Sequence, residues 1–397
     1  MTRIATKAIL IAVLAIAWYG VNPRVWAQTA SGEAPHIGQG GLPQFAEERG
    51  WLKLPAKWRL GNTSAVSVDA QGHVWVLHRP RTLPENLRAL AAPPVLEFDG
   101  AGNFVQGWGP LTGSGSSPVQ NETLPYEWPE NEHGLHVDAQ GFVWIVGNAM
   151  PQDGQILKFT KAGKFVMQIG KRGQTGGNTT PFLLGASGLR LHPKRNELFV
   201  SDGYGNSRVM VYDAASGAFK RMWGAYGRKP IDPPSIAIGE PTSPTSQIPS
   251  GIAERLQHFK TVHDVALSND DLVYIADRGN KRVQVFTLDG TYVSQQFVGL
   301  DSPEYQQARS TAFSHDPEQR FLYVAGSPVI YILNRKTLEV LGEFVIGAAQ
   351  ANPPGHQIAA DQHGNIYAPQ AAQAGPDGKG GGSTVQKFAF KGFSPRR

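Results

Sequence analysis

The 397-residue sequence predicts an all-β fold, a six-bladed β-propeller with four short strands in each blade. The first observation behind this prediction is one sequence pattern that recurs six times, which is typical of repeat architectures. The second is that each copy alternates apolar and polar residues between Gly, Asp and Asn turns, as β-strands do. The third is composition, because 46 Gly and only 17% charged residues are unlike a helical bundle or a disordered chain.

The repeat is clearest in its first two copies. Residues 65–77 hold two alternating runs around an Asp-Ala-Gln-Gly turn, and residues 135–145 repeat this arrangement almost unchanged. A second pair of runs follows in each copy, at residues 95–108 and 155–169. In chain order the copies begin at Ala65, Leu135, Leu189, Val265, Ala312 and Ile358. Two stacked β-sandwiches would not require so regular a repeat.

The last copy shows only three clear strands, which end near Phe390. We expect an N-terminal strand to complete this blade, and the apolar residues within 50–60, among them Trp51 and Trp58, are predicted to form it. The predicted organisation is therefore a signal peptide, a linker, the propeller and a short tail, at residues 1–27, 28–49, 50–392 and 393–397.

The N-terminal segment resembles a secretory leader. Arg3 and Lys7 precede an apolar run over residues 8–18, and Val25-Trp26-Ala27 fits a cleavage site before Gln28. An uncleaved anchor is the alternative, but this run is shorter than the ~20 residues that a span needs. The sequence therefore predicts an exported protein, periplasmic or extracellular, with no membrane span after cleavage.

Charge and composition also exclude several functions. The leader carries three basic residues and no acid, so it accounts for much of the net charge of +5. The sequence contains no cluster of Lys and Arg of the kind that binds nucleic acid, so a nucleic-acid partner is not predicted. The absence of Cys excludes disulfides, thiolate metal sites and a cysteine nucleophile. The sequence contains neither a Gly-rich phosphate loop nor a G-x-S-x-G elbow, so nucleotide hydrolysis and serine-hydrolase chemistry are not predicted.

The connections differ in length on the two faces of the predicted ring. Short turns join strands one to two and strands three to four, and both turns lie on the same face of an up-and-down blade. The long connections should then lie on the other face, at residues 79–93, 108–132, 171–186, 224–262 and 370–383. Because binding residues gather on loops over a rigid scaffold, we expect the functional site on this second face.

Histidine recurs at one position of the repeat. The residue just before each innermost strand is, in chain order, Ser64, His133, Ser187, His263, Ser310 and His356. Alternate blades of a six-fold ring are related by a three-fold rotation, so the three imidazoles should converge on the axis. Three neutral imidazoles with an open fourth position form a catalytic Zn²⁺ site. The alternative is that these are ordinary polar residues at strand starts.

Three further residues are predicted to lie beside these histidines, at the ends of second strands. Arg79 lies 15 residues after Ser64, and Arg278 lies 15 after His263, so they share a register. Two guanidinium groups suit a carboxylate or another oxyanion. Tyr204, near a metal and arginines, could act as a base. The structural alternatives are arginines that brace neighbouring blades and a tyrosine that caps the core.

At these residues the chain resembles the peptidyl-α-hydroxyglycine α-amidating lyases, within the NHL-repeat propellers. The resemblance covers most of residues 60–390 and rests on short motifs. These are Gly61-Asn-x-Ser64, His78-Arg79, His133-Gly-Leu135, Ser201-Asp-Gly-Tyr-x-Asn-Ser-Arg208, His263-Asp264 and Ala276-Asp-Arg278.

The resemblance implies a six-bladed NHL-type propeller that holds Zn²⁺ on His133, His263 and His356. It implies Tyr204 as general base, with Arg79 and Arg278 holding the substrate and its carboxylate. The implied reaction cleaves a peptidyl-α-hydroxyglycine, or another α-hydroxy-amide, into an amide and glyoxylate. The family's calcium ligand is an Asp after the third histidine, whereas Gln357 follows His356 here, so Ca²⁺ is doubtful.

Two functional hypotheses therefore stand. The first is a zinc lyase that acts on a small carboxylate-bearing or peptide substrate. The second is a non-catalytic exported propeller that binds a peptide, glycan or protein partner on its elaborated face. A lactonase-type propeller would need axial Asp, Glu and Asn ligands for Ca²⁺, and the histidine register argues against it.

Overall fold

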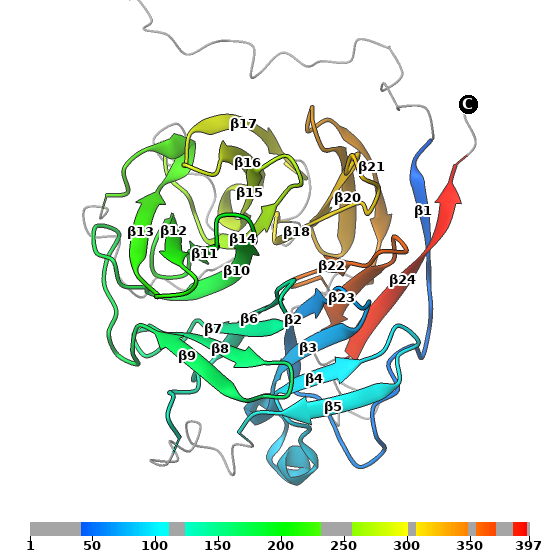
Figure 1. The fold of residues 1–397 in the computed structure, drawn as a ribbon. Helices are drawn as coiled ribbons and strands as arrows, with labels where there is room; N and C mark the ends of the chain where they lie inside the picture. Colours follow the sequence, from blue (N-terminus) through cyan, green and yellow to red (C-terminus); the bar gives the residue numbers. More distant parts are fainter. Residues whose placement is uncertain are drawn as a thin grey trace, which may run out of the picture. The chain divides into compact units, whose positions relative to one another are not determined.

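The computed structural model describes residues 41–110, 124–231, 256–300, 307–347, 355–370 and 384–394. Their strands form six four-stranded antiparallel sheets, which surround a common axis as the blades of a propeller (Figure 1). The innermost strands of neighbouring blades contact one another from β2 through β22 and back to β2, which closes the ring. The predicted six-bladed, all-β architecture is confirmed.

The six blades follow one another along the chain. Blade I is β2 (Asn62–Val68), β3 (Val74–Arg79), β4 (Val95–Phe98) and β5 (Phe104–Trp108); blade II is β6 (Glu132–Val137), β7 (Phe142–Gly147), β8 (Ile156–Thr160) and β9 (Phe165–Ile169). Blade III is β10 (Ala186–His192), β11 (Glu197–Asp202), β12 (Arg208–Asp213) and β13 (Phe219–Trp223); blade IV is β14 (Val262–Leu267), β15 (Leu272–Asp277), β16 (Arg282–Thr287) and β17 (Tyr292–Phe297). Blade V is β18 (Ser310–Phe313), β19 (Phe321–Ala325), β20 (Val329–Asn334) and β21 (Val340–Val345); blade VI is β22 (Ala359–Ala360), β23 (Ile366–Gln370), β24 (Thr384–Phe393) and β1 (Pro43–Glu47).

The ring is closed by an N-terminal strand, as predicted, but not by the predicted residues. β1 pairs antiparallel with β24, so the strand is Pro43–Glu47 and the prediction of residues 50–60 is wrong. The alternation of β1 places Phe45 against Phe344, with ring centroids 4.7 Å apart. Residues 50–60 instead bury Trp51 and Leu60 against blades I and VI.

This closure changes the predicted boundaries of the propeller. The first strand lies inside the segment 28–49 that the sequence suggested was a linker. At the other end β24 runs to Phe393, and the Ser394 amide donates to the Leu42 carbonyl at 2.8 Å. The predicted signal peptide, residues 1–27, lies outside the described residues.

The recurring Asp-x-x-Gly turns explain why the repeat is so regular. In blade II one oxygen of Asp138 accepts hydrogen bonds from the Gln140 and Phe142 amides, and the other accepts from the Trp144 indole at 2.8 Å. Gly141 has a φ of +83°, which favours glycine. Blade I repeats this arrangement with Asp69, whose side chain accepts from the Trp75 indole at 3.0 Å. In these two blades the turn fixes the register of its hairpin and anchors a fully buried tryptophan in the core.

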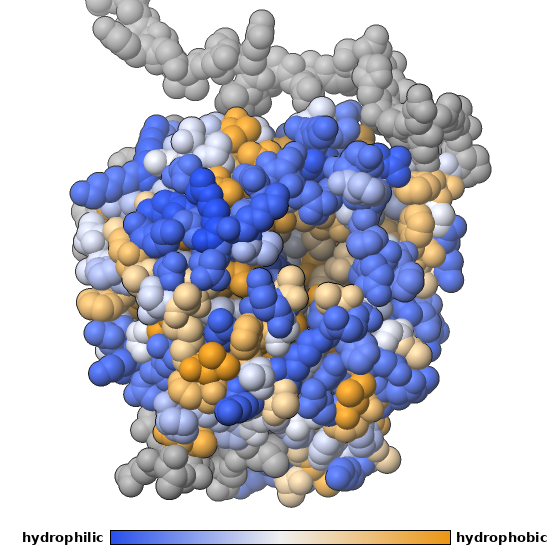
Figure 2. Space-filling model, in the orientation of Figure 1, coloured by the Kyte–Doolittle hydropathy of each residue, from blue (hydrophilic) through white to orange (hydrophobic). Residues whose placement is uncertain are grey.

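Regular helices are nearly absent from the part of the chain that the structure describes. Four short 3₁₀ helices occur there, η2 (Pro80–Thr82), η3 (Glu85–Leu90), η4 (Ala225–Gly227) and η5 (Arg278–Asn280). Within the described segments, no helix has the length and apolar character to cross a bilayer. The molecular surface is largely hydrophilic and is hollowed near the middle of the face seen in Figure 2.

Candidate metal centre

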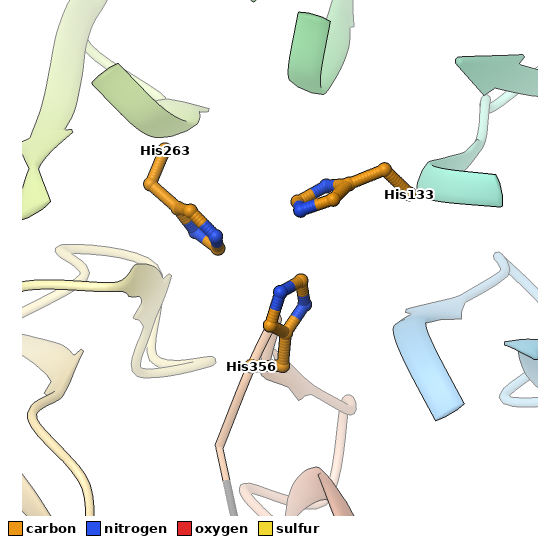
Figure 3. A group of neighbouring side chains, drawn as sticks. All are labelled: His133, His263 and His356. Atoms are coloured by element: carbon orange, nitrogen blue, oxygen red, sulfur yellow. The ribbon is translucent and has the colours of Figure 1, made fainter. Parts of the chain in front are cut away.

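Three histidines from alternate blades point toward one another at the propeller axis (Figure 3). His133 lies on β6, His263 on β14, and His356 just before β22. Each ring offers one nitrogen, and these three nitrogens lie within 4.8 Å of one another. The ring centroids are 4.5 to 5.1 Å apart. The structure thus brings together all three histidines that the sequence register singles out.

Local β-bulges position two of these side chains, His133 and His263. The pairing of β6 with β7 shifts between Glu132 and Gly134, so that His133 has no cross-strand partner. β14 is bulged in the same way at His263. A bulge re-aims its extra residue, and here it turns a strand side chain toward the axis. The innermost strands β2 and β10 are bulged at the serines of the register, Ser64 and Ser187.

Hydrogen bonds to the next blade set the tautomer of every ring. The Nδ1 of His133 donates to the Ser187 carbonyl at 2.8 Å, and that of His356 donates to the Ser64 carbonyl at 2.6 Å. The Nδ1 of His263 donates to the Arg309 carbonyl at 2.7 Å. Because a carbonyl can only accept, each Nδ1 carries the proton and each Nε2 keeps its lone pair. Metal-binding histidines commonly donate their other ring N–H to a backbone carbonyl in this way, which fixes the orientation of the ring.

The environment also keeps the three rings uncharged. Burial lowers the pKa of His133, His263 and His356 well below the usual value. The positive charge of Arg79 lowers the pKa of His133 further, and the His133 ring is the next largest cause for His263 and His356. A neutral imidazole is the form that binds a metal ion. Three neutral, inward-facing Nε2 atoms therefore fit Zn²⁺ and match the donor set of a three-histidine catalytic zinc site.

Tyr204 lies directly beside the histidine cluster, two residues beyond the end of β11. Its hydroxyl is 2.9 Å from Nε2 of His133 and 3.1 Å from Nε2 of His263. The Arg278 guanidinium donates to the same oxygen at 3.3 Å. The phenol thus contacts two of the predicted ligands and one of the predicted substrate-binding arginines.

The two predicted arginines are anchored through Nε. Arg79 donates from Nε to the Glu132 carbonyl at 2.7 Å, which braces blade I against the residue before His133. Arg278 donates from Nε to Gln307 Oε1 at 2.6 Å. No carboxylate among the described residues forms a salt bridge with either one. The predicted bracing of neighbouring elements is therefore observed for both arginines, and each side chain has further terminal N–H groups beyond its anchored Nε.

Two buried ion pairs position the residues around this centre. Asp202 pairs with Arg208 at 3.0 Å, and Asp277 pairs with Arg282 at 2.7 Å, with all four side chains fully buried. Asp202 ends the strand that leads to Tyr204, and Asp277 directly precedes Arg278. The two pairs are equivalent in blades III and IV. The sequence signal was visible as an Asp followed by an Asn and an Arg in both turns, but its positioning role was not predicted.

Glu132 is a buried acid at this centre that sequence reasoning missed. It pairs with Arg81 at 3.0 Å and accepts from the Trp128 indole at 2.9 Å. Burial raises the pKa of the Glu132 carboxyl in spite of Arg81.

Arg309 is a second missed residue. It directly precedes Ser310 of the histidine register, its carbonyl holds His263, and its side chain is only 8% exposed. Burial and, secondarily, Arg278 lower the pKa of Arg309 to about 9.

A second group of possible ligand residues has a structural explanation. Asp69, His73 and Glu97 each offer an atom within 4.8 Å of the others. Both oxygens of Asp69 are occupied, one by turn amides and the other by the Trp75 indole and Lys161 at 2.7 Å. His73 and Glu97 bond directly at 2.6 Å. We therefore assign this group to the hairpin turn.

The geometry defines a class of protein, a six-bladed β-propeller with three imidazoles on its axis. Comparison with known proteins adds that residues 259–286 match the NHL repeat. Peptidylglycine alpha-amidating monooxygenase of Rattus norvegicus is 24% identical over 77% of this chain and 29% of its own length. Peptidyl-alpha-hydroxyglycine alpha-amidating lyase 1 of Drosophila melanogaster is 28% identical over 61% of this chain and 41% of its own.

NHL repeat-containing protein 3 of Mus musculus is similarly distant, at 25% identity over 71% of this chain and 67% of its own length. The solved streptogramin B lyase structure superimposes with a TM-score of 0.49 and 12% identity, over 88% of this chain and 98% of that one. The chain spans about a third of the length of the amidating monooxygenases that it matches. It is thus a six-bladed β-propeller in which one segment matches the NHL repeat, and it is distantly similar to amidating enzymes and to NHL repeat-containing protein 3.

Proposed function

We propose that the protein is a zinc-dependent lyase that cleaves an α-hydroxy-amide, such as peptidyl-α-hydroxyglycine, into an amide and glyoxylate. One observation carries this proposal. Three neutral histidine Nε2 atoms lie within 4.8 Å of one another on the axis, and the Tyr204 hydroxyl lies within hydrogen-bond distance of two of them and of the Arg278 guanidinium. The names of the relatives that include amidating lyases support the same reaction class.

In this proposal His133, His263 and His356 hold the ion through Nε2, and the carbonyls behind them keep the rings oriented. Bound Zn²⁺ would supply a Lewis acid that stabilises negative charge on an oxygen of the substrate. No acid lies among the three proposed ligands, so the ion would keep most of its positive charge.

The chain's own residues would carry the proton. The Tyr204 hydroxyl takes the proton from the substrate hydroxyl as it gives its own proton to the amide nitrogen. The electron pair of the broken substrate O–H bond forms the carbonyl of glyoxylate, and the amide nitrogen leaves with the C–N electron pair. Base and acid are thus the same residue, and the products are a neutral amide and glyoxylate.

Arg79 and Arg278 would bind the substrate carboxylate. Both are anchored through Nε, and both lie close enough to His133 to lower its pKa. A carboxylate held there places the adjacent carbon beside Tyr204.

The apolar run of residues 8–18, with its cleavage-like Val25-Trp26-Ala27, supports the further proposal that the protein is exported.

The experiment that tests this function is turnover of N-benzoyl-α-hydroxyglycine by the zinc-loaded protein, with benzamide and glyoxylate both quantified. We expect equimolar products, and loss of turnover in His133→Ala with the fold retained by circular dichroism. Full turnover in His133→Ala would exclude the proposed site. Arg49→Met, which changes a largely exposed side chain, is the matched control and should keep wild-type turnover.

A further inference from the structure

Arg309 is a buried cation without a counter-charge among the described residues. Its side chain is 8% exposed, and its Nε has no hydrogen-bond partner in that part of the chain. None of the salt bridges between described residues includes Arg309. By contrast, the two fully buried arginines near the site, Arg208 and Arg282, each pair with a buried aspartate. A buried charge without a partner is destabilising, so its retention points to a ligand that neutralises it.

The position of Arg309 links it to the candidate metal centre. Its carbonyl accepts from Nδ1 of His263, so the residue lies directly behind that ring. After burial, the positive charge of Arg278, which contacts Tyr204 at this centre, is the next cause that lowers the pKa of Arg309. Two neighbouring guanidinium groups repel each other, and an anion between them removes that repulsion.

The surrounding acids are already used by other arginines. Glu132 pairs with Arg81, Asp202 with Arg208, and Asp277 with Arg282. Arg190 is the partner nearest to the buried Asp264, at 3.8 Å. Counting the described residues alone, Arg79, Arg278 and Arg309 form an excess of positive charge at the centre. One substrate carboxylate neutralises only part of this excess.

We infer that Arg309 and Arg278 form a second anion site beside the histidines, and that the substrate is a dianionic α-hydroxy-amide. This inference rests on the proposed lyase function. One carboxylate belongs to the hydroxyglycine carbon, and the other belongs to the acyl part whose amide is released. Arg309 is thus a specificity-determining residue that selects an acidic acyl group.

The test compares two substrates that differ by one charge, N-succinyl-α-hydroxyglycine and its succinyl methyl ester. We expect wild-type zinc-loaded protein to prefer the free acid by at least ~10-fold in kcat/KM, because a charge-assisted hydrogen bond contributes that much. Arg309→Met should abolish the preference by raising KM for the acid, with kcat for the acid changed less than about twofold. Arg309→Lys, which keeps the charge, should retain part of the preference. The surface variant Arg49→Met should retain all of it.

Equilibrium binding of succinate separates this inference from the lyase function. If neither compound turns over but wild type binds succinate at least ~10-fold more tightly than Arg309→Met, the anion site stands and the lyase reaction is refuted. If both compounds turn over at equal kcat/KM, the lyase reaction stands and the second anion site is refuted. If Arg309→Met does not fold or does not bind zinc, Arg309→Lys takes its place in the comparison. If neither wild type nor Arg309→Lys then prefers the free acid over the methyl ester, the inference is overturned.

Discussion

Replacing Asp277 with Asn would test how the fold holds Arg278 at the centre. In the wild type, Oδ1 of Asp277 accepts from the Lys260 amide, while Oδ2 accepts from Arg282 Nε at 2.7 Å and from Asn280 at 2.8 Å. An Asn side chain has the same shape, but its amide group would place a donor against these donors. The Arg282 guanidinium, which is fully buried, would then lose its counter-charge.

Removal of one partner from a buried ion pair costs about 3–5 kcal/mol of folding free energy. Burial raises the pKa of Asp277 even beside Arg282, which shows that desolvation offsets part of the attraction. Arg282 also keeps hydrogen bonds to the Leu256 and His258 carbonyls at 2.9 Å each. We therefore expect the lower end of the range, about 3 kcal/mol. We also expect a higher KM, because Arg278 directly follows Asp277.

Urea unfolding at pH 7 measures the first effect, and the equivalent Asp202→Asn variant in blade III should behave alike. The double variant Asp277→Asn/Arg282→Met should recover at least half of the loss, because it removes the uncompensated charge. A loss below about 1 kcal/mol in Asp277→Asn, or no recovery in the double variant, would refute this explanation of how the pair stabilises blade IV.

Three further predictions follow from the same structure. Tyr204→Phe should lower kcat by about 10²–10⁴-fold while zinc content is unchanged; a kcat near that of wild type, measured by glyoxylate release, would exclude the proposed proton transfer. Burial lowers the pKa of His78 to about 4, below its unfolded value, so unfolded chains bind more protons and stability falls as pH drops below about 6.5. His78→Gln should therefore reduce the loss of unfolding free energy between pH 7 and pH 5 by about 2 kcal/mol, and an identical pH dependence in both proteins would contradict it. Phe45→Ala should destabilise the ring closure by about 2 kcal/mol in urea unfolding, since Phe45 stacks on Phe344; a change within ±0.5 kcal/mol would show that β1 contributes little.

The architecture could be predicted from sequence because the same pattern of strands and turns recurs six times along the chain. Each copy carries the same turn chemistry, such as Asp138 with Trp144, so the strands and their order follow from local patterns. The closing strand was assigned to the wrong residues because β1 has only one large apolar side chain, Phe45, whereas residues 50–60 are richer in them. Those aromatic residues pack in the core without forming a strand, and hydrophobicity alone does not separate the two outcomes.

The site was visible only where it followed the register. His133, His263 and His356 share one position in alternate blades, so a sequence alignment of the repeats brings them together. The bulges that aim His133 and His263, and the carbonyls that fix the tautomers of all three rings, are backbone features, which carry no residue signature. Arg309 also escaped notice because the features that single it out, its burial and an Nε without a partner among the described residues, are visible only in the surrounding structure.

The most direct test of the proposed metal centre is the zinc content of the purified protein beside a His133→Ala/His263→Ala double variant. Because three neutral Nε2 atoms face one point, we expect about one zinc ion per wild-type chain after supply of zinc and removal of excess. The double variant should hold less than about a tenth of that amount with unchanged circular dichroism. A wild-type protein that holds no zinc under these conditions, or a double variant that holds as much, would contradict the metal centre on the propeller axis.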